Sequence, residues 1–303
     1  KLNPGKPIDA VLVNACECEP YITVDYRECI ENAENILKGV EILRDILGFK
    51  QVIIAIEDNK PKVFEIMKEI ADRDNNAGDT IKLMTLRSRY PQGAEKMMIL
   101  SATGRKVPPG KLPSDVGCVV INVASVAFIA RYLETGKPLI SRSITVDGSA
   151  IRTPKNLRVP IGTNIQDIID YCGGFKTEPR KIISGGPMMG IAGVNLDAPI
   201  TKISSGILIL KDESAYKPEV NPCIRCATCV DVCPQGLEPY LIHSLIRNGE
   251  YQEAKKIHVL DCIECGCCAY SCPARIPLLD YCKLAKYEIR KNKNKDTVNN
   301  TIT

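Results

Sequence analysis

The chain has 303 residues, 45% of them hydrophobic and 25% charged, and its formal net charge is +4. So small a charge, spread along the chain, gives no indication of nucleic-acid binding. The longest apolar run, at 116–130, is shorter than the ~20 residues that a membrane-spanning helix needs, so we expect any membrane contact only through partners.

The first part of the chain, 1–136, alternates apolar strands with amphipathic helices. We predict strands and helices in turn at 9–14, 26–48, 51–57, 60–73, 80–86, 93–104, 118–123 and 124–136. This alternation is typical of a Rossmann-like α/β domain with a largely parallel sheet. Lys1 is not a methionine and the first strand follows almost at once, so we expect that an N-terminal portion of this domain precedes the sequence.

The pattern changes at 137–212 to several short strands around one helix, which starts after Asn164 and stops at Gly173 and Gly174. This arrangement predicts a compact α+β domain of the β-grasp type. A polar linker at 211–220 leads into a helical, cysteine-rich domain at 218–292, and 293–303 form a polar tail.

Two stretches of the cysteine-rich domain repeat one spacing, C-x2-C-x2-C-x3-C-P: CIRCATCVDVCP at 223–234 and CIECGCCAYSCP at 262–273. This is the spacing of bacterial two-cluster ferredoxins, in which three cysteines of one motif hold a [4Fe–4S] cluster and the fourth ligates the other cluster. We therefore predict cluster 1 on Cys223, Cys226, Cys229 and Cys272. We predict cluster 2 on Cys262, Cys265, Cys268 and Cys233.

Zinc is the alternative metal, because CxxC pairs also build zinc ribbons. A ribbon uses two pairs and has no use for the third cysteine or the closing Cys-Pro of each motif. Cys267 falls outside the spacing and is expected to be a bystander, and Cys282 to belong to the core. The two histidines, His243 and His258, lie in the stretch between the two motifs, which is predicted to form two short helices, and we interpret both as structural.

The loop at 13–27 is rich in acidic and sulfur-containing side chains and follows the first predicted strand. The carboxyl end of a strand is the usual ligand position in open α/β sheets. No G-x-G-x-x-G or P-loop motif occurs in the chain, so an ordinary polar loop remains an alternative to a nucleotide site.

Six stretches, in order along nearly the whole chain, resemble the C subunit of the Rnf electron-transport complex. They are NACECEPYITVDYR (14–27), RYPQGAEKMMILSATGRKVPPGKLPSDVG (89–117), INVAS (121–125), ISGGPMMG (183–190), NPCIRCATCVDVCPQGLEPY (221–240) and DCIECGCCAYSCPARIPL (261–278). The front portion also resembles the flavin subunit of respiratory complex I, where NADEGEP stands in place of NACECEP. The middle domain resembles the soluble-ligand-binding β-grasp (SLBB) module.

The resemblance implies FMN on the first domain, with NADH stacking against it. The matching flavin-site positions are Asn14, Cys16, Glu17, Glu19, Tyr90, Gly93, Glu95, Asn122 and Ser125. Of these, Glu19 is expected near the nicotinamide. The sequence departs from the pattern in two ways: the family's glycine-rich phosphate loop would precede Lys1, and Cys16 and Ala94 stand where complex I relatives carry acids.

The function that the resemblance implies is electron transfer: electrons pass from NADH, or to it, through FMN and two [4Fe–4S] clusters. The setting would be a membrane-associated Rnf-type ferredoxin:NAD oxidoreductase that drives ion transport. Its other subunits, membrane and ferredoxin-type, would be the partners, and the chain would lie peripherally on the cytoplasmic side of the cell membrane. One alternative is a soluble relative that carries electrons to another reductase, such as proline reductase. Another is a flavin-free iron–sulfur relay or assembly subunit.

Overall fold

A computed structural model describes residues 6–49, 51–73, 81–193, 195–211 and 219–301, without the side chains of 292–301. Most of the predicted linker at 211–220 lies outside these residues. The chain divides into two compact units, Lys1–Tyr216 and Lys217–Thr303, which are described separately.

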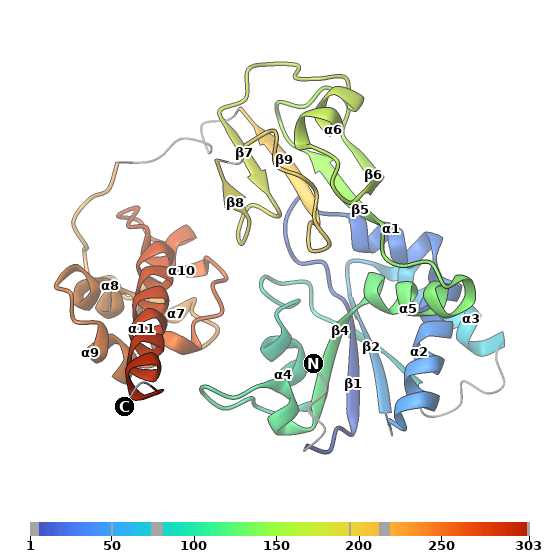
Figure 1. Ribbon diagram of the computed structural model, residues 1–303, viewed down its shortest axis with the longest axis horizontal. Helices are drawn as coiled ribbons and strands as arrows, with labels where there is room; N and C mark the ends of the chain where they lie inside the picture. Colours follow the sequence, from blue (N-terminus) through green and yellow to red (C-terminus); the bar gives the residue numbers. More distant parts are fainter. Residues whose placement is uncertain (1–5, 50, 74–80, 194, 212–218, 302–303) are drawn as a thin grey trace. The chain divides into compact units, whose positions relative to one another are not determined.

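The first unit contains a parallel four-stranded sheet in the order β3-β2-β1-β4 (Figure 1). Its strands are β1 (Ala10–Ala15), β2 (Gln51–Glu57), β3 (Ile81–Leu86) and β4 (Cys118–Asn122). Successive side chains of a strand point to opposite faces, so Val11 and Val13 enter one buried core while Ala10 and Leu12 enter another. The predicted α/β domain with a parallel sheet is confirmed.

Helices cover both faces of this sheet. On one face lie α1 (Val24–Glu31), α2 (Ala33–Leu47), α3 (Pro61–Arg73) and α5 (Val123–Thr135). The other face is covered by α4 (Glu95–Thr103), with the short 3-10 helix η1 (Pro113–Val116) close to β4. Gly39 lets α2 approach α5 closely, because a Cβ there would lie 2.3 Å from the carbonyl oxygen of Val126.

One sequence prediction about the helices is wrong. The single helix expected at 26–48 is two helices, α1 and α2, separated by Asn32. Asn32 has φ −127° and ψ 27°, outside the helical region. Asparagine is a weak helix former because its side chain competes for backbone hydrogen bonds, whereas the apolar periodicity continues across the break.

The first unit also contains a mixed five-stranded sheet, in the order β6-β5-β9-β7-β8. Its strands are β5 (Ser141–Asp147), β6 (Lys155–Pro160), β7 (Lys181–Ser184), β8 (Ile191–Ala192) and β9 (Gly206–Leu210). The helix α6 (Ile165–Tyr171) packs on one face around Ile144, Ile169 and Ile209. The expected β-grasp type of α+β domain is therefore present. On the opposite face of this sheet, Ile183 and Leu208 pack against Ile22 of the loop after β1.

The second unit is helical. It contains α7 (Thr228–Asp231), α8 (Pro239–Arg247), α9 (Tyr251–Lys256), the 3-10 helix η3 (Val259–Asp261), α10 (Cys267–Tyr270) and α11 (Leu278–Thr301). Ile242 and Ile246 of α8 share a core with Ala285 and Ile289 of α11. No helix in the described part of either unit is long and apolar enough to cross a membrane.

Candidate functional site

The two cysteine motifs have the same unusual backbone. Arg225 and Ala227 in the first motif have φ of 56° and 59°, and the equivalent Glu264 and Gly266 in the second have 59° and 80°. Left-handed conformations are rare for residues other than glycine, so three such residues at matched positions mark a specified loop shape. Loops with left-handed residues can turn successive N–H groups toward one side and form anion-binding nests, a geometry found at many iron–sulfur sites.

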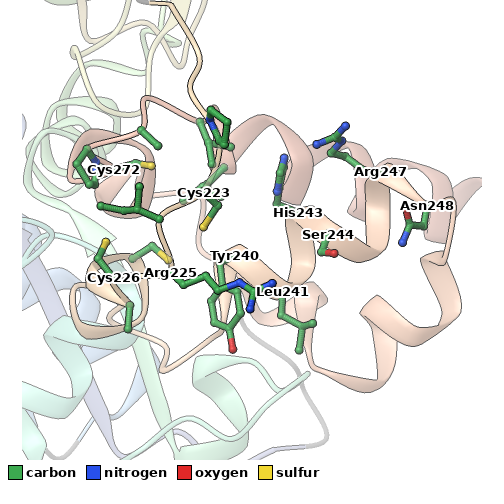
Figure 2. Close-up of a pocket in the computed structure, with 18 residues that line it drawn as sticks. Cys223, Arg225, Cys226, Tyr240, Leu241, His243, Ser244, Arg247, Asn248 and Cys272 are labelled. Atoms are coloured by element: carbon green, nitrogen blue, oxygen red, sulfur yellow. The ribbon is translucent and has the colours of Figure 1, made fainter.

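Cysteines from both motifs meet around two separate cavities. The first, about 710 Å³, is lined by Cys223, Cys226, Cys229 and Cys272, and Figure 2 shows Cys223, Cys226 and Cys272 on its wall. The second, about 20 Å³, is lined by Cys233, Cys262, Cys265 and Cys268. Each cavity therefore includes the three spaced cysteines of one motif and the last cysteine of the other, as the spacing predicts, and Cys267 and Cys282 also line the second cavity.

The donor set fits iron–sulfur clusters better than a single metal ion. Among the described residues, no group of three or more His, Cys, Asp or Glu side chains is arranged to hold one ion. A four-iron cluster takes each thiolate on a different iron, so its ligands need not converge on one point as zinc ligands do. Backbone N–H groups already point at the sulfurs, with Leu237 N 3.4 Å from Cys233 Sγ and Glu264 N 3.4 Å from Cys262 Sγ.

Other side chains sit close to these cysteines. Cys267 lines the second cavity, and the buried Cys282 of α11 lies within hydrogen-bonding reach of the Cys262 sulfur. The His243 ring lines the first cavity and meets the Tyr281 ring edge-on, with centroids 4.4 Å apart. His258 is exposed, 3.8 Å from an Asp261 oxygen.

A third cavity, of about 530 Å³, lies at the carboxyl ends of three strands of the parallel sheet. Its walls are 17–23 and Tyr26 after β1, Glu57 and 59–62 at and after β2, and 88–90 after β3. Both the size and the position at the carboxyl edge are typical of cofactor sites in open α/β sheets.

Glu17 is held by the protein's own helix α1. Its carboxylate accepts hydrogen bonds from the backbone N–H groups of Asp25, at 2.7 Å, and Tyr26, at 3.1 Å. Lys60 Nζ lies 3.5 Å from this carboxylate and 3.2 Å from that of Glu57. Burial and the charge of Asp25 raise the pKa of Glu17, whereas Lys60 and the two N–H groups act in the opposite direction.

Glu19 connects the loop after β1 to the β-grasp domain. Its carboxylate accepts hydrogen bonds from the backbone N–H groups of Met188, at 3.1 Å, and Met189, at 2.9 Å, in the turn between β7 and β8. Gly186 in this turn leaves room for the carboxylate, because a Cβ there would lie 2.3 Å from Glu19 Oε2. Tyr90 also hydrogen-bonds to Glu19, so two predicted site residues meet at this point.

Asn14, Cys16 and Gly93 lie together beside the cavity and do not line it. Asn14 Nδ2 donates to Gly93 O at 2.9 Å, and Asn14 Oδ1 accepts from Cys16 N at 3.0 Å. A Cβ on Gly93 would lie 2.6 Å from Cys16 O, so this contact requires glycine. The Cys16 sulfur is buried and lies 3.5 Å from Ala55 O. These residues fix the end of β1 and the start of the following loop to the segment before α4.

The remaining predicted residues are elsewhere on the same edge of the sheet. Asn122 Oδ1 accepts from Ala124 N at 3.0 Å, which caps α5, and its Nδ2 donates to Asp25 Oδ2 at 2.6 Å. Ser125 is half-buried within α5, and Glu95 is exposed at the start of α4. Of the nine positions, Glu17, Glu19 and Tyr90 line the cavity.

Several lining residues were missed by sequence reasoning. Glu57 ends β2, Asn59, Lys60 and Lys62 follow it, and Arg89 follows β3. A signal for them was available, because parallel strands end at the same edge and EDNK (57–60) follows a strongly predicted strand. Nearby, Gln92 is 2% exposed, and its Nε2 has no hydrogen-bond partner among the described residues. Buried polar groups are normally bonded, so this orphaned donor fits a site that holds a further group.

The carboxyl group of Asp25, a half-buried residue of α1 that is hydrogen-bonded to Asn122, predicts a pH dependence of stability. Burial raises its pKa, and the hydrogen bond from Asn122 opposes this only in part. A raised pKa favours the protonated acid in the fold, so the stability it contributes is present below the unfolded pKa and lost as pH rises through the folded pKa. Asp25→Asn keeps an oxygen for Asn122 but cannot ionise. In denaturant unfolding at about pH 5 and about pH 8, the gain in stability of Asp25→Asn over the parent should be larger at the higher pH. A gain that is larger at the lower pH would contradict this.

Family models match the three domains. They are the Nuo51 FMN-binding domain at 1–131, the SLBB domain at 143–192 and the 4Fe-4S dicluster domain at 216–273. These matches agree with the order of the parallel-sheet domain, the mixed-sheet domain and the cysteine-rich helical unit.

Curated relatives match over almost the whole chain. The C subunit of the proton-translocating ferredoxin:NAD(+) oxidoreductase complex of Clostridium ljungdahlii is 49% identical, covering 95% of this chain and 62% of its own length. The Na(+)-translocating counterpart of Acetobacterium woodii is 41% identical, covering 96% and 65%. The C subunit of the ion-translocating oxidoreductase complex of Rhodobacter capsulatus is 42% identical, covering 97% and 57%. The chain thus spans about three fifths of the length of these relatives.

A solved structure shares the fold. A chain of an NAD+-reducing [NiFe]-hydrogenase in the H2-reduced state matches with a TM-score of 0.64 and 13% identity, covering 93% of this chain and 56% of that one. At this identity the likeness concerns the fold alone.

Proposed function

Because the chain belongs to the family of C subunits of ion-translocating ferredoxin:NAD(+) oxidoreductase complexes, we propose that it is the module through which electrons pass between NADH and the rest of such a complex. The observation that carries the proposal is the meeting of cysteines from two distant motifs around two cavities, each of which takes in the last cysteine of the other motif. Cysteine sites of this kind suit a carrier of single electrons.

The eight cysteines would hold two [4Fe–4S] clusters. The first cluster would take Cys223, Cys226, Cys229 and Cys272, and the second Cys262, Cys265, Cys268 and Cys233. The proposal is supported by the lining of the cavities, because Cys272 lies with the first motif at the first cavity and Cys233 with the second motif at the second. The protein's part is to supply eight thiolates and to direct backbone N–H groups at the sulfurs.

The cavity at the carboxyl edge of the parallel sheet would hold FMN, with NADH entering beside it. Bound FMN supplies the exchange of a hydride with NADH and of single electrons with the clusters. Lys62 and Arg89 provide positive charge for a phosphate, and Tyr21, Tyr26 and Tyr90 provide aromatic surface. The other predicted flavin-site residues, Asn14, Cys16, Glu17, Glu19, Gly93, Glu95, Asn122 and Ser125, would shape or border this site. Several act through the loop and helix contacts described above.

The proposed setting follows from the relatives' names. The chain would act with the other subunits of a membrane-associated complex and lie peripherally on its cytoplasmic side. The domains would span 1–136, 137–212 and 218–292, followed by the tail at 293–303. The relatives are named for different ions, protons and Na+, so the proposal assigns none.

The proposal is tested on the full-length protein that contains this chain, purified without oxygen. We expect about eight irons per chain and about one flavin, released by acid and measured by fluorescence, and we expect NADH to bleach the flavin and then the clusters. Protein that holds its iron but never flavin, and that NADH does not reduce, would favour the flavin-free relay. Full activity with a soluble reductase and none with the membrane subunits would favour the soluble carrier.

A further inference from the structure

A buried lysine lies against the second cysteine motif. Lys286 of α11 is 8% exposed, and burying an ammonium group is costly unless it is paired. Its Nζ donates to the carbonyl oxygen of Cys262 at 3.1 Å and also binds the carboxylate of Glu264. Both contacts are within the motif, so the positive charge is held at the first cysteine of the second set.

The two charges of this pair are not equally screened. The Lys286 side chain is 10% exposed and that of Glu264 is 33% exposed. Water weakens the field of an exposed charge more than that of a buried one. Both charges lie close to Cys262, because Lys286 contacts its carbonyl oxygen and the backbone N–H of Glu264 lies 3.4 Å from its sulfur.

The first motif offers an internal comparison, because the two halves of the cysteine-rich unit repeat one another. Lys286 lies fourteen residues after Cys272, and Arg247 lies fourteen residues after Cys233. In the same way Glu264 corresponds to Arg225, each being the second residue after the first cysteine of its motif. Both arginines are exposed, and both line the first cavity (Figure 2). The repeat therefore places a buried lysine, paired with a partly exposed glutamate, against the second motif, and two exposed arginines at the first cavity.

We propose that Lys286 and Glu264 set the reduction potential of the cluster held by Cys262, Cys265, Cys268 and Cys233, in opposite directions. The inference rests on the proposed function, which places a cluster on these cysteines. Reduction adds one electron and no proton to the site, and the electron comes from reduced flavin in the complex or from dithionite in a test. An added negative charge is favoured by the lysine and opposed by the glutamate. Lys286 raises the potential and Glu264 lowers it.

The test is a redox titration of each cluster, followed by electron paramagnetic resonance on the full-length protein. The signal of cluster 2 is identified as the one that a Cys233→Ser variant lacks. For Lys286→Met we expect the ratio of oxidised to reduced cluster 2 at a fixed potential to rise about tenfold, a shift of ~59 mV to lower potential for a one-electron couple. Glu264→Gln should shift the same signal to higher potential.

Two further variants control for structure. Lys286→Arg keeps the charge and should keep a potential close to that of the parent, even if packing changes. Arg247→Met removes the equivalent but exposed charge at the first cavity and should change the ratio of oxidised to reduced cluster 2 by less than threefold, because water screens this charge. Shifts of the same sign for Lys286→Met and Glu264→Gln, or no shift in either, would overturn the inference. A parent protein without a second cluster would instead overturn the proposed function, so the two failures are distinguishable.

Discussion

Replacing Cys233 with serine should remove the cluster of the second motif and spare that of the first, although Cys233 belongs to the first motif. The reason is the crossed arrangement, in which Cys233 lines the cavity of Cys262, Cys265 and Cys268. Iron content should fall from about eight to about four per chain. Cys272→Ser should give the same iron content by losing the other cluster.

Alkylation of the free thiols, read by mass spectrometry, identifies which cluster has gone. In Cys233→Ser the cysteines that become reactive should be those at 262, 265 and 268, and in Cys272→Ser those at 223, 226 and 229. The matched control is Cys267→Ser. Cys267 lines the second cavity but falls outside the ligand spacing, so this variant should keep about eight irons. If Cys233→Ser instead frees the cysteines of its own motif, each motif binds its cluster alone and the crossed assignment is wrong.

The fold could be predicted where a local pattern decides the structure. QVIIAIE at 51–57 is a run of β-branched residues flanked by polar ones, and the strand β2 has the same bounds. The break at Asn32 was missed because the apolar stripe of α1 continues into α2. The strand β8 was missed because two residues, Ile191 and Ala192, carry no periodicity, and their pairing with β7 is decided by the turn between them.

The two candidate sites differ in how far sequence reasoning reaches. Cysteine spacing predicts the metal sites because the ligands of one cluster come mostly from one short loop. The flavin positions came from resemblance, which names residues and not their contacts. Glu17 and Asn122 bind the N-terminal N–H groups of α1 and α5, and Lys60 joins Glu17 to Glu57. The contact of Glu17 with Lys60 joins two residues that lie far apart in the chain, so no local pattern reveals it.

Glu19→Gln should raise the equilibrium constant for opening of the turn between β7 and β8 by roughly ten- to a hundredfold. The carboxylate accepts two backbone N–H bonds, whereas a glutamine side chain has one acceptor and turns an NH2 group toward the second donor. Losing one hydrogen bond to a charged acceptor costs about 1.5–3 kcal/mol, which corresponds to this range of opening. Amide exchange at Met188 and Met189 measures it. Glu69→Gln is the control, because that exposed carboxylate pairs with Arg73 on α3 and its loss should leave the turn unchanged.

The same variant decides how Glu19 acts in electron entry. Its carboxylate is bound to the β-grasp turn, so we expect NADH-dependent reduction of the full-length protein to slow by about tenfold or more as the turn opens, with about eight irons retained. Dithionite, which bypasses the flavin, should still reduce the clusters at the parental rate. Gly186→Ala, whose Cβ would lie 2.3 Å from Glu19 Oε2, displaces the same contact without changing the charge. If both variants speed amide exchange and slow NADH-dependent reduction, Glu19 acts by holding the turn. If Glu19→Gln slows NADH-dependent reduction while amide exchange stays at the parental rate, the carboxylate acts on the nicotinamide directly. Its hydrogen bonds to the turn are then not its role in electron entry.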